Sequence, residues 1–157
     1  MYILKNNIFY DKIKKINTSE VIMSKQINKF ESLLQQNKDY YIEHRFINKG
    51  EYFAPHWHNY FELEIVLSGS GEHIYNNTNY TLERGSIYLM SYYDFHELSA
   101  KEDIQILKLQ FNENVLPNEL NDFLFLSHNR FCCSVGENEM QHIIKLFSIL
   151  KREEERG

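Results

Sequence analysis

Hydrophobic and polar residues alternate through the middle of this chain, and the clearest case is the segment 61–67. Its odd-numbered positions are all apolar, whereas its even-numbered positions begin with Glu62 and Glu64. Side chains two residues apart share a face of a strand, so this pattern predicts a β-strand with two different faces. If the even face lines the interior, both glutamates point into a pocket. The apolar face must then be covered from outside, by helices or by a second subunit.

Similar short runs recur at spacings of roughly ten residues, with turn signals such as those at 68–71 and 76–79 between them. Short strands at this spacing predict a sandwich or barrel. Besides 61–67, the predicted strands are 40–47, 72–75, 80–82, 86–90, 96–99 and 104–111.

Helical periodicity flanks these strands on both sides. Apolar residues at Met23, Ile27, Phe30 and Leu34 predict a helix over about 18–36 within the segment 17–37. On the C-terminal side we expect a short helix at 117–126, a strand at 131–135 and a helix at 137–155. The last helix carries an apolar stripe that would pack either on the strands or on the same helix of a second copy. The stripe consists of Met140, Ile143, Ile144, Phe147 and Leu150, and Leu146 and Ile149 widen it.

Composition narrows the class of protein further. The chain has 157 residues, 43% hydrophobic and 25% charged, as expected for one soluble globular domain. It contains neither a run of about eighteen apolar residues, the length that a membrane helix needs, nor the features of a signal peptide. We therefore expect a cytoplasmic protein without a membrane partner. A net charge of −5 argues against nucleic-acid binding by this segment, because such domains normally present a basic face.

A candidate metal site lies at the start of the alternating region. His56, His58 and Glu62 fall within seven residues and are all even-numbered, so one unbroken strand would point them the same way. Two imidazoles and a carboxylate on one side suit a divalent metal. The simpler alternative for an isolated pair of histidines is a polar strand end near solvent.

The spacing around these residues resembles the first sequence motif of the cupins. Gly50, His56, His58, Glu62 and Gly69 fall at the positions of that motif. Gly85 and His96 resemble the second motif, which opens with a glycine and places one more histidine about ten residues later. Three turn and packing positions differ from the second motif: Ser91, Tyr93 and Ala100.

Within the cupins, the segments PHWHNYFELEIVLSGSG and GSIYLMSYYDFHEL are most similar to the N-terminal domain of AraC-type transcriptional regulators. The resemblance implies a mainly β fold, a cupin (double-stranded β-helix, jelly-roll-like) barrel with flanking N- and C-terminal α-helices. It divides the chain into an arm and helix at 1–38, a barrel at 39–112 and a helical dimerisation region at 113–157. Regulators of this type bind DNA through a helix-turn-helix domain, which would follow residue 157.

The implied function is to sense a small-molecule effector and to form a homodimer that acts on DNA through the missing domain. As metal ligands the resemblance assigns His56, His58, Glu62 and His96, which suit zinc, nickel, iron or manganese. Register in the predicted strands offers Glu64, Tyr88 and Met90 as further contacts to a bound effector. The alternatives are a small metal-dependent cupin enzyme of the dioxygenase or isomerase type, and a pure dimerisation module. We expect His44, His73, His128 and His142 to be surface or packing residues.

Overall fold

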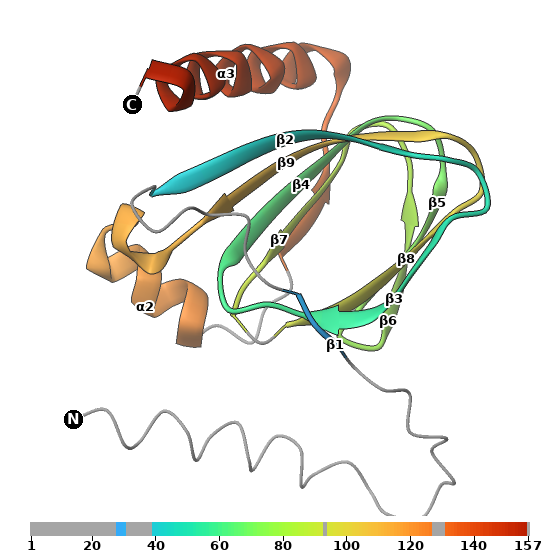
Figure 1. Ribbon diagram of the computed structural model, residues 1–157, viewed down its shortest axis with the longest axis horizontal. Coiled ribbons are helices and arrows are strands. Elements are labelled where there is room, and N and C mark those ends of the chain that lie inside the picture. The colour runs from blue at the N-terminus through green and yellow to red at the C-terminus, as the bar shows by residue number, and fades with distance from the viewer. Residues whose placement is uncertain (1–27, 31–38, 93, 127–130, 157) are drawn as a thin grey trace, which may run out of the picture.

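The structure is a computed structural model that describes residues 28–30, 39–92, 94–126 and 131–156. These residues form two five-stranded sheets, in the orders β1-β3-β8-β5-β6 and β10-β7-β4-β9-β2 (Figure 1). The strands are β1 (Asn28–Lys29), β2 (Tyr40–Ile47), β3 (Tyr52–Trp57), β4 (Phe61–Ser68), β5 (Gly71–Tyr75), β6 (Thr78–Leu82), β7 (Ser86–Met90), β8 (Phe95–Ala100), β9 (Ile104–Phe111) and β10 (Phe131–Ser134). This mainly β, jelly-roll-like architecture with a C-terminal helix confirms the predicted fold class.

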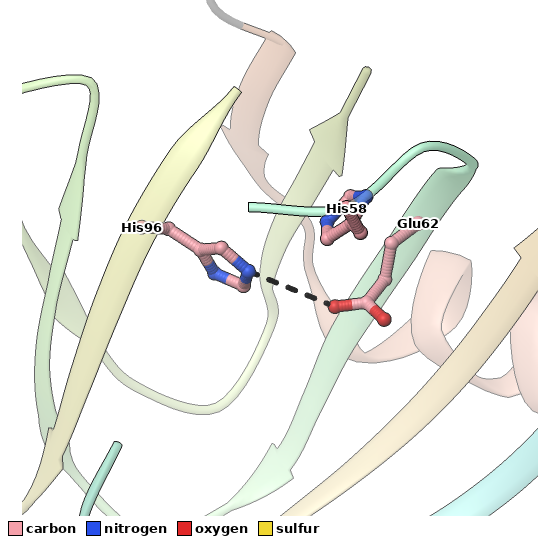
Figure 2. A group of neighbouring side chains, drawn as sticks. All are labelled: His58, Glu62 and His96. Atoms are coloured by element: carbon pink, nitrogen blue, oxygen red, sulfur yellow. Dashed lines mark ion pairs between the residues drawn. The ribbon is translucent and has the colours of Figure 1, made fainter. Parts of the chain in front are cut away.

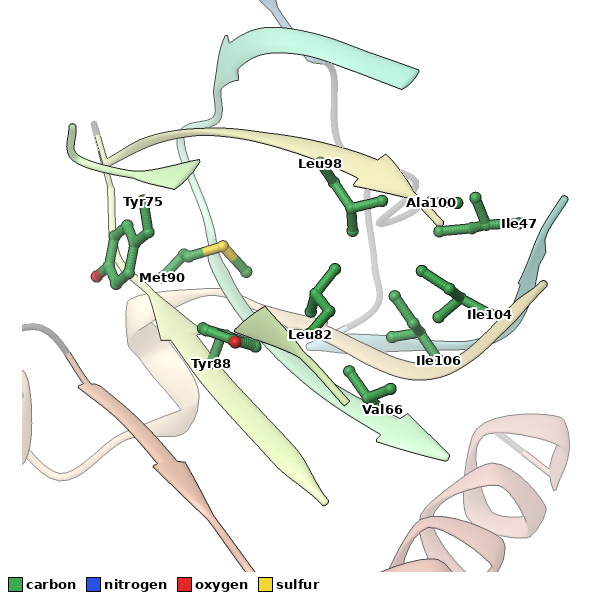
Figure 3. Close-up of a cluster of buried hydrophobic side chains, with 10 residues drawn as sticks. All are labelled: Ile47, Val66, Tyr75, Leu82, Tyr88, Met90, Leu98, Ala100, Ile104 and Ile106. Carbon is green, nitrogen blue, oxygen red and sulfur yellow. The ribbon is translucent and has the colours of Figure 1, made fainter. Parts of the chain in front are cut away.

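The main hydrophobic core lies between the two sheets, and residues from both contribute to it (Figure 3). Val66 and Ile106 from one sheet pack with Leu82 and Leu98 from the other, and all four are at most 5% exposed. The complete cluster contains Ile47, Val66, Tyr75, Leu82, Tyr88, Met90, Leu98, Ala100, Ile104 and Ile106.

Strand β4 has the two faces that its sequence predicts. Glu62, Glu64 and Val66 are buried on the inside, whereas Ile65 packs outward against the C-terminal helix. Two helices follow the last long strand: α2 (Asn118–Leu126), after a short 3-10 helix at Glu113–Val115, and α3 (Glu137–Arg156). Figure 1 shows α3 lying along the outer side of the sheet that contains β2, β9 and β4.

The apolar stripe of α3 docks on this sheet of its own chain. Met140 and Phe147 form a buried cluster with Ile42 and Ile65, and Ile143, Ile144 and Leu150 pack against it. Tyr40 Oη donates a hydrogen bond to the Leu150 carbonyl oxygen at 3.0 Å, which ties the helix to β2. Of the two alternatives for this stripe, the structure therefore shows packing on the strands of the same chain. The stripe is not available for packing against a second copy. Leu146 and Ile149, on the other side of the helix, are 58% and 38% exposed.

At two motif positions, Gly69 and Gly85, another segment of backbone lies so close that only glycine fits. Gly69 has φ +87°, and a β-carbon there would lie 2.1 Å from the carbonyl oxygen of Asp103. Gly85 has φ +92°, and a β-carbon would lie 2.4 Å from the carbonyl oxygen of Val135. Both positions exclude a side chain, because the backbone conformation and the space each demand glycine.

The predicted N-terminal helix at 18–36 is wrong where the structure describes it. Asn28 and Lys29 form strand β1, which runs parallel to β3 with Asn28 opposite His56. The remainder of that prediction, and the arm before it, lie outside the described residues. On the C-terminal side, β10 pairs with β7, so the second sheet extends past the predicted barrel boundary at 112. No helix in the described part of the chain is long and apolar enough to cross a membrane.

The docking of α3 predicts how one substitution in this helix changes the stability of the protein. Phe147→Ala should lower the free energy of unfolding by about 3–5 kcal/mol, since it leaves a cavity between the helix and the sheet. Phe123→Ala on α2 is the matched control, because Phe123 is 54% exposed, and it should cost roughly 1 kcal/mol or less. Urea denaturation measures both. Equal losses for the two variants would contradict the docking.

Candidate functional site

The candidate ligands come from β3, from the turn that follows it, and from β4 and β8. Strand β3 ends at Trp57 and β4 begins at Phe61, so His58 lies in the turn between two strands. The three residues therefore do not lie on one unbroken strand, and shared parity does not by itself explain where they point. The pairing of β3 with β8 also shifts register between Phe53 and His56, where Pro55 removes a backbone donor from the ladder.

His58, Glu62 and His96 nevertheless converge inside the barrel (Figure 2). Each offers one ligand atom, and these atoms all lie within 4.8 Å of one another. His96 Nε2 is 4.0 Å from Glu62 Oε1. All three side chains are buried, at most 3% exposed. The convergence arises because the turn folds His58 back over the start of β4 and places both opposite β8.

The hydrogen bonds of His58 leave one ring nitrogen directed at this group. Its Nδ1–H donates to the carbonyl oxygen of Tyr60 at 2.8 Å, so Nε2 keeps its lone pair. Among the described residues, His58 Nε2 and His96 Nε2 have no hydrogen-bond partner although both are buried. A backbone carbonyl that fixes the remote ring nitrogen is the usual support of a metal-binding histidine. The donor atoms thus fit two histidines and a carboxylate around a divalent metal.

His56, the fourth predicted ligand, lies at the edge of this group. Its ring is 4.1 Å from that of His96, between centroids, and stacks at 3.9 Å on the exposed side chain of Phe30. Its Nδ1–H donates to the carbonyl oxygen of Ala54 at 2.9 Å. The structure places His56 next to His96 on one side and Phe30 on the other, outside the convergent group His58, Glu62 and His96.

Lys108, on the inner side of β9, supplies a buried positive charge that the sequence analysis did not identify. Its Nζ lies 3.0 Å from Glu62 Oε1 and 2.9 Å from Glu64 Oε1. Gln110 Nε2 donates to the other oxygen of Glu62 at 3.1 Å. Two carboxylates and one ammonium leave one negative charge in excess inside the barrel when the histidines are neutral.

Burial and this ion pair set the charge states of the cluster. Burial alone would raise the pKa of Glu64, but the Lys108 ammonium lowers it to about 2. Burial would lower the pKa of Lys108, yet Glu62 and Glu64 hold it above its ordinary value. Burial lowers the pKa of His56 and of His73, and lowers that of His96 well below its ordinary value. These pKa shifts favour a charged Glu64 and Lys108 at neutral pH and neutral rings at His56, His73 and His96.

His73 joins the cluster from β5, although we expected it to be a surface or packing residue. Its Nε2 lies 2.9 Å from His96 Nδ1, and the side chain is fully buried. One of these two nitrogens must carry the hydrogen. If His96 Nδ1 carries it, His96 Nε2 keeps a free lone pair toward Glu62, as a ligand needs.

The three predicted effector contacts occupy different places. Glu64 is part of the charged cluster and borders a small cavity. Tyr88 and Met90 lie in the hydrophobic core between the sheets. The Tyr88 hydroxyl donates to the Thr81 carbonyl oxygen at 3.1 Å, and burial raises its pKa to about 12. Tyr88 also touches His73, with 4.5 Å between ring centroids, so it borders the cluster from the core side.

Comparison with known families identifies the fold. A family described as the AraC-like ligand binding domain matches residues 40–157, well over half of the chain. The chain belongs to the AraC-like ligand binding domain family. This confirms the resemblance that the spacing of the motif residues suggested.

Relatives of this AraC-like domain include regulators of known name. HTH-type transcriptional activator RhaS from Yersinia pestis (strain Pestoides F) and from Yersinia pseudotuberculosis serotype O:1b (strain IP 31758) are each 35% identical over 75 residues. The match covers 48% of this chain and 25% of each relative, so the chain spans about a quarter of their length. ToxT from Vibrio cholerae O395 shares the fold, with a TM-score of 0.56 and 13% identity over 72% of this chain and 49% of that chain.

The sequence did not identify Lys108 and His73 as site residues of this AraC-like domain. Only Lys108 lies in a sequence pattern that predicts its position. Lys108 has the same parity in β9 as the core residues Ile104 and Ile106, so the alternation already placed it on the inner face. His73 gave no such signal, because it reaches His96 through the pairing of β5 with β8. That pairing joins segments whose register the sequence does not fix.

The neutral histidines predict how the stability of the AraC-like domain depends on pH. His56, His73 and His96 have pKa values lowered from 6.5 in the folded protein, so below about pH 6.5 the unfolded chain binds more protons. The free energy of unfolding should therefore fall between pH 7 and 5, by up to about 1.4 kcal/mol per pH unit for each histidine. Urea denaturation across this range measures the slope.

Two variants test which histidine causes the dependence of the free energy of unfolding on pH. His73→Asn should reduce it by the contribution of about one proton, whereas His142→Asn, at an exposed position on α3, should retain the wild-type slope. A His73→Asn variant with an unchanged slope would contradict a neutral buried His73.

Proposed function

We propose that this chain is the effector-sensing domain of a DNA-binding transcriptional regulator. The observation that carries the proposal is the family match over residues 40–157, together with relatives that are named as HTH-type transcriptional activators. DNA would be contacted by a separate helix-turn-helix domain, because this chain carries a net charge of −5, which does not favour binding to a phosphate backbone. The protein would act in the cytoplasm, where it has access to DNA.

The buried polar cluster is the natural place for an effector to act. Buried polar atoms are normally paired, yet Glu64 Oε2, His58 Nε2 and His96 Nε2 have no hydrogen-bond partner within the described ranges. A ligand that donates hydrogen bonds would satisfy these atoms and gain more affinity than at a solvated surface. We therefore assign effector contact to Glu64 and to these histidines, with Tyr88 and Met90 as the apolar floor beneath them.

Entry to the cluster would require a movement at Phe30. The cavity beside the cluster has a volume of about 20 Å³ and is bordered by Phe30, Phe53, His56 and Lys108. A cavity of this size holds about one water molecule and no organic effector. Phe30 is 39% exposed and stacks on His56 at the mouth. Displacement of Phe30 would widen the cavity at its outer end and admit a larger molecule.

The alternative of a metal-dependent enzyme rests on the group His58, Glu62 and His96. Two histidines and one carboxylate leave coordination positions open for substrate or oxygen. Lys108, however, already holds the oxygen of Glu62 that a metal would use. We therefore place the regulator first.

A fusion experiment tests effector sensing. Residues 1–157 are joined to a heterologous DNA-binding domain that represses its operator as a dimer only, and a reporter is read during growth on different small molecules. We expect repression that one class of small molecule changes, and Glu64→Gln should abolish that response without loss of the folded protein. Lys101→Met, at the exposed ion pair with Glu72, is the control and should retain the response. A fusion that represses but never responds to any added compound would argue for a dimerisation module.

We also propose a homodimer that uses the outer side of α3. Leu146 and Ile149 are exposed one turn apart on this helix, so they lie on one face. Two-fold dimers bury the same patch on both subunits. The inner stripe docks the helix on its own sheet and would hold this outer face rigidly for a partner.

The dimer proposal predicts the effect of charge on that face. Leu146→Glu/Ile149→Glu would bury unpaired charges between the helices, so the dimer dissociation constant should rise at least 100-fold, while the monomer keeps its fold. Asn79→Glu/Thr81→Glu adds the same charge at exposed positions on β6 and should leave association unchanged. Sedimentation equilibrium and circular dichroism measure assembly and fold. An unchanged dimer in the first variant would place the interface elsewhere.

A further inference from the structure

The ammonium of Lys108 and a divalent metal would compete for the same carboxylate oxygen. Glu62 Oε1 lies 3.0 Å from Lys108 Nζ and 4.0 Å from His96 Nε2. The Lys108 side chain is 8% exposed and contacts Glu64 as well. Contacts with both glutamates hold its ammonium group at the edge of the three convergent donors.

We propose that Lys108 is the resident cation of this site, which takes the electrostatic place of a divalent metal and keeps such a metal out. The proposal concerns metal binding in the interior of the domain, so its test does not depend on the regulatory function.

Distances and charge both support the exclusion. A metal at about 2.1 Å from Glu62 Oε1 would lie no more than about 5 Å from the Lys108 ammonium, and two cations at that distance repel strongly where water is absent. The charges agree with this. Lys108 with Glu62 and Glu64 leaves one negative charge in excess, and a divalent ion would turn this into an excess positive charge. If Lys108 were neutral, a divalent ion would balance the two carboxylates.

The donor atoms themselves do not prevent metal binding. His58 Nε2 and His96 Nε2 are buried without a partner in the described part of the chain, and the His58 ring is fixed by its bond to the Tyr60 carbonyl oxygen. Lys108 is a cation in direct contact with Glu62, so its charge opposes a metal at this oxygen. Replacement of this residue should therefore create a metal site without any new ligand.

Zinc binding to the full chain tests the proposal. The zinc dissociation constant is measured by competition with a chromogenic chelator for the wild type, for Lys108→Met, and for Lys108→Met/Glu64→Gln. The double variant has the same net charge in the cluster as the wild type, so it separates removal of the ammonium from a change in total charge. Glu64→Gln with Lys108 intact is the matched control, and the spectrum of bound Co²⁺ reports the ligands.

We expect the double variant to bind one equivalent of zinc at least about ten-fold more tightly than the wild type or Glu64→Gln. Adding His58→Ala to the double variant should abolish this gain. If Lys108→Met does not fold, the double variant carries the test, and folding of either variant upon zinc addition counts as binding. The proposal is overturned if the wild type binds zinc as tightly as the double variant, or if the double variant gains no affinity.

Discussion

The burial of charge between the two sheets is the constraint on which the rest of this structure depends. Lys108 is buried against Glu62 and Glu64, and the loss of one partner from a buried pair typically costs about 3–5 kcal/mol. Glu64 and Lys108 are also direct neighbours in the register of β4 and β9. A slip of β4 by one residue would turn Glu62 and Glu64 to the outer face and leave Lys108 buried without them, so the ion pair favours the observed alignment of the two strands.

The same two strands connect the cluster to helix α3. On β4, Glu64 faces the interior while Ile65 packs outward with Met140 and Phe147. On β9, Lys108 faces inward and its neighbours Leu107 and Leu109 pack under the helix. A ligand that moved Lys108 or Glu64 would act on residues directly bonded to those that hold α3. Strand alternation therefore gives the interior a short mechanical connection to the surface that we propose for dimerisation.

The mouth of the cavity is the least enclosed part of the site. Phe30 directly follows β1, a strand of two residues that pairs with β3 in parallel, and it stacks on His56. The described contacts include this ring stack, a hydrogen bond from Phe30 N–H to the Trp57 carbonyl oxygen and Lys29 over the Trp57 ring. Segments with few buried apolar contacts open at low free energy. The displacement of Phe30 that we propose for ligand entry would act on this short segment.

The sequence by itself determined the strands other than β1 and β3, the two faces of β4, and the spacing of the motif residues His58, Glu62 and His96. These depend on alternation and on local spacing, which a single chain displays directly. Only the tertiary structure decided that His56 turns toward Phe30 and that His73 meets His96. It also decided that α3 covers its own sheet, and that Lys108 stands between two glutamates. The physical reason is that each of these contacts joins segments far apart in the chain, whose meeting depends on strand register and on the turn at His58.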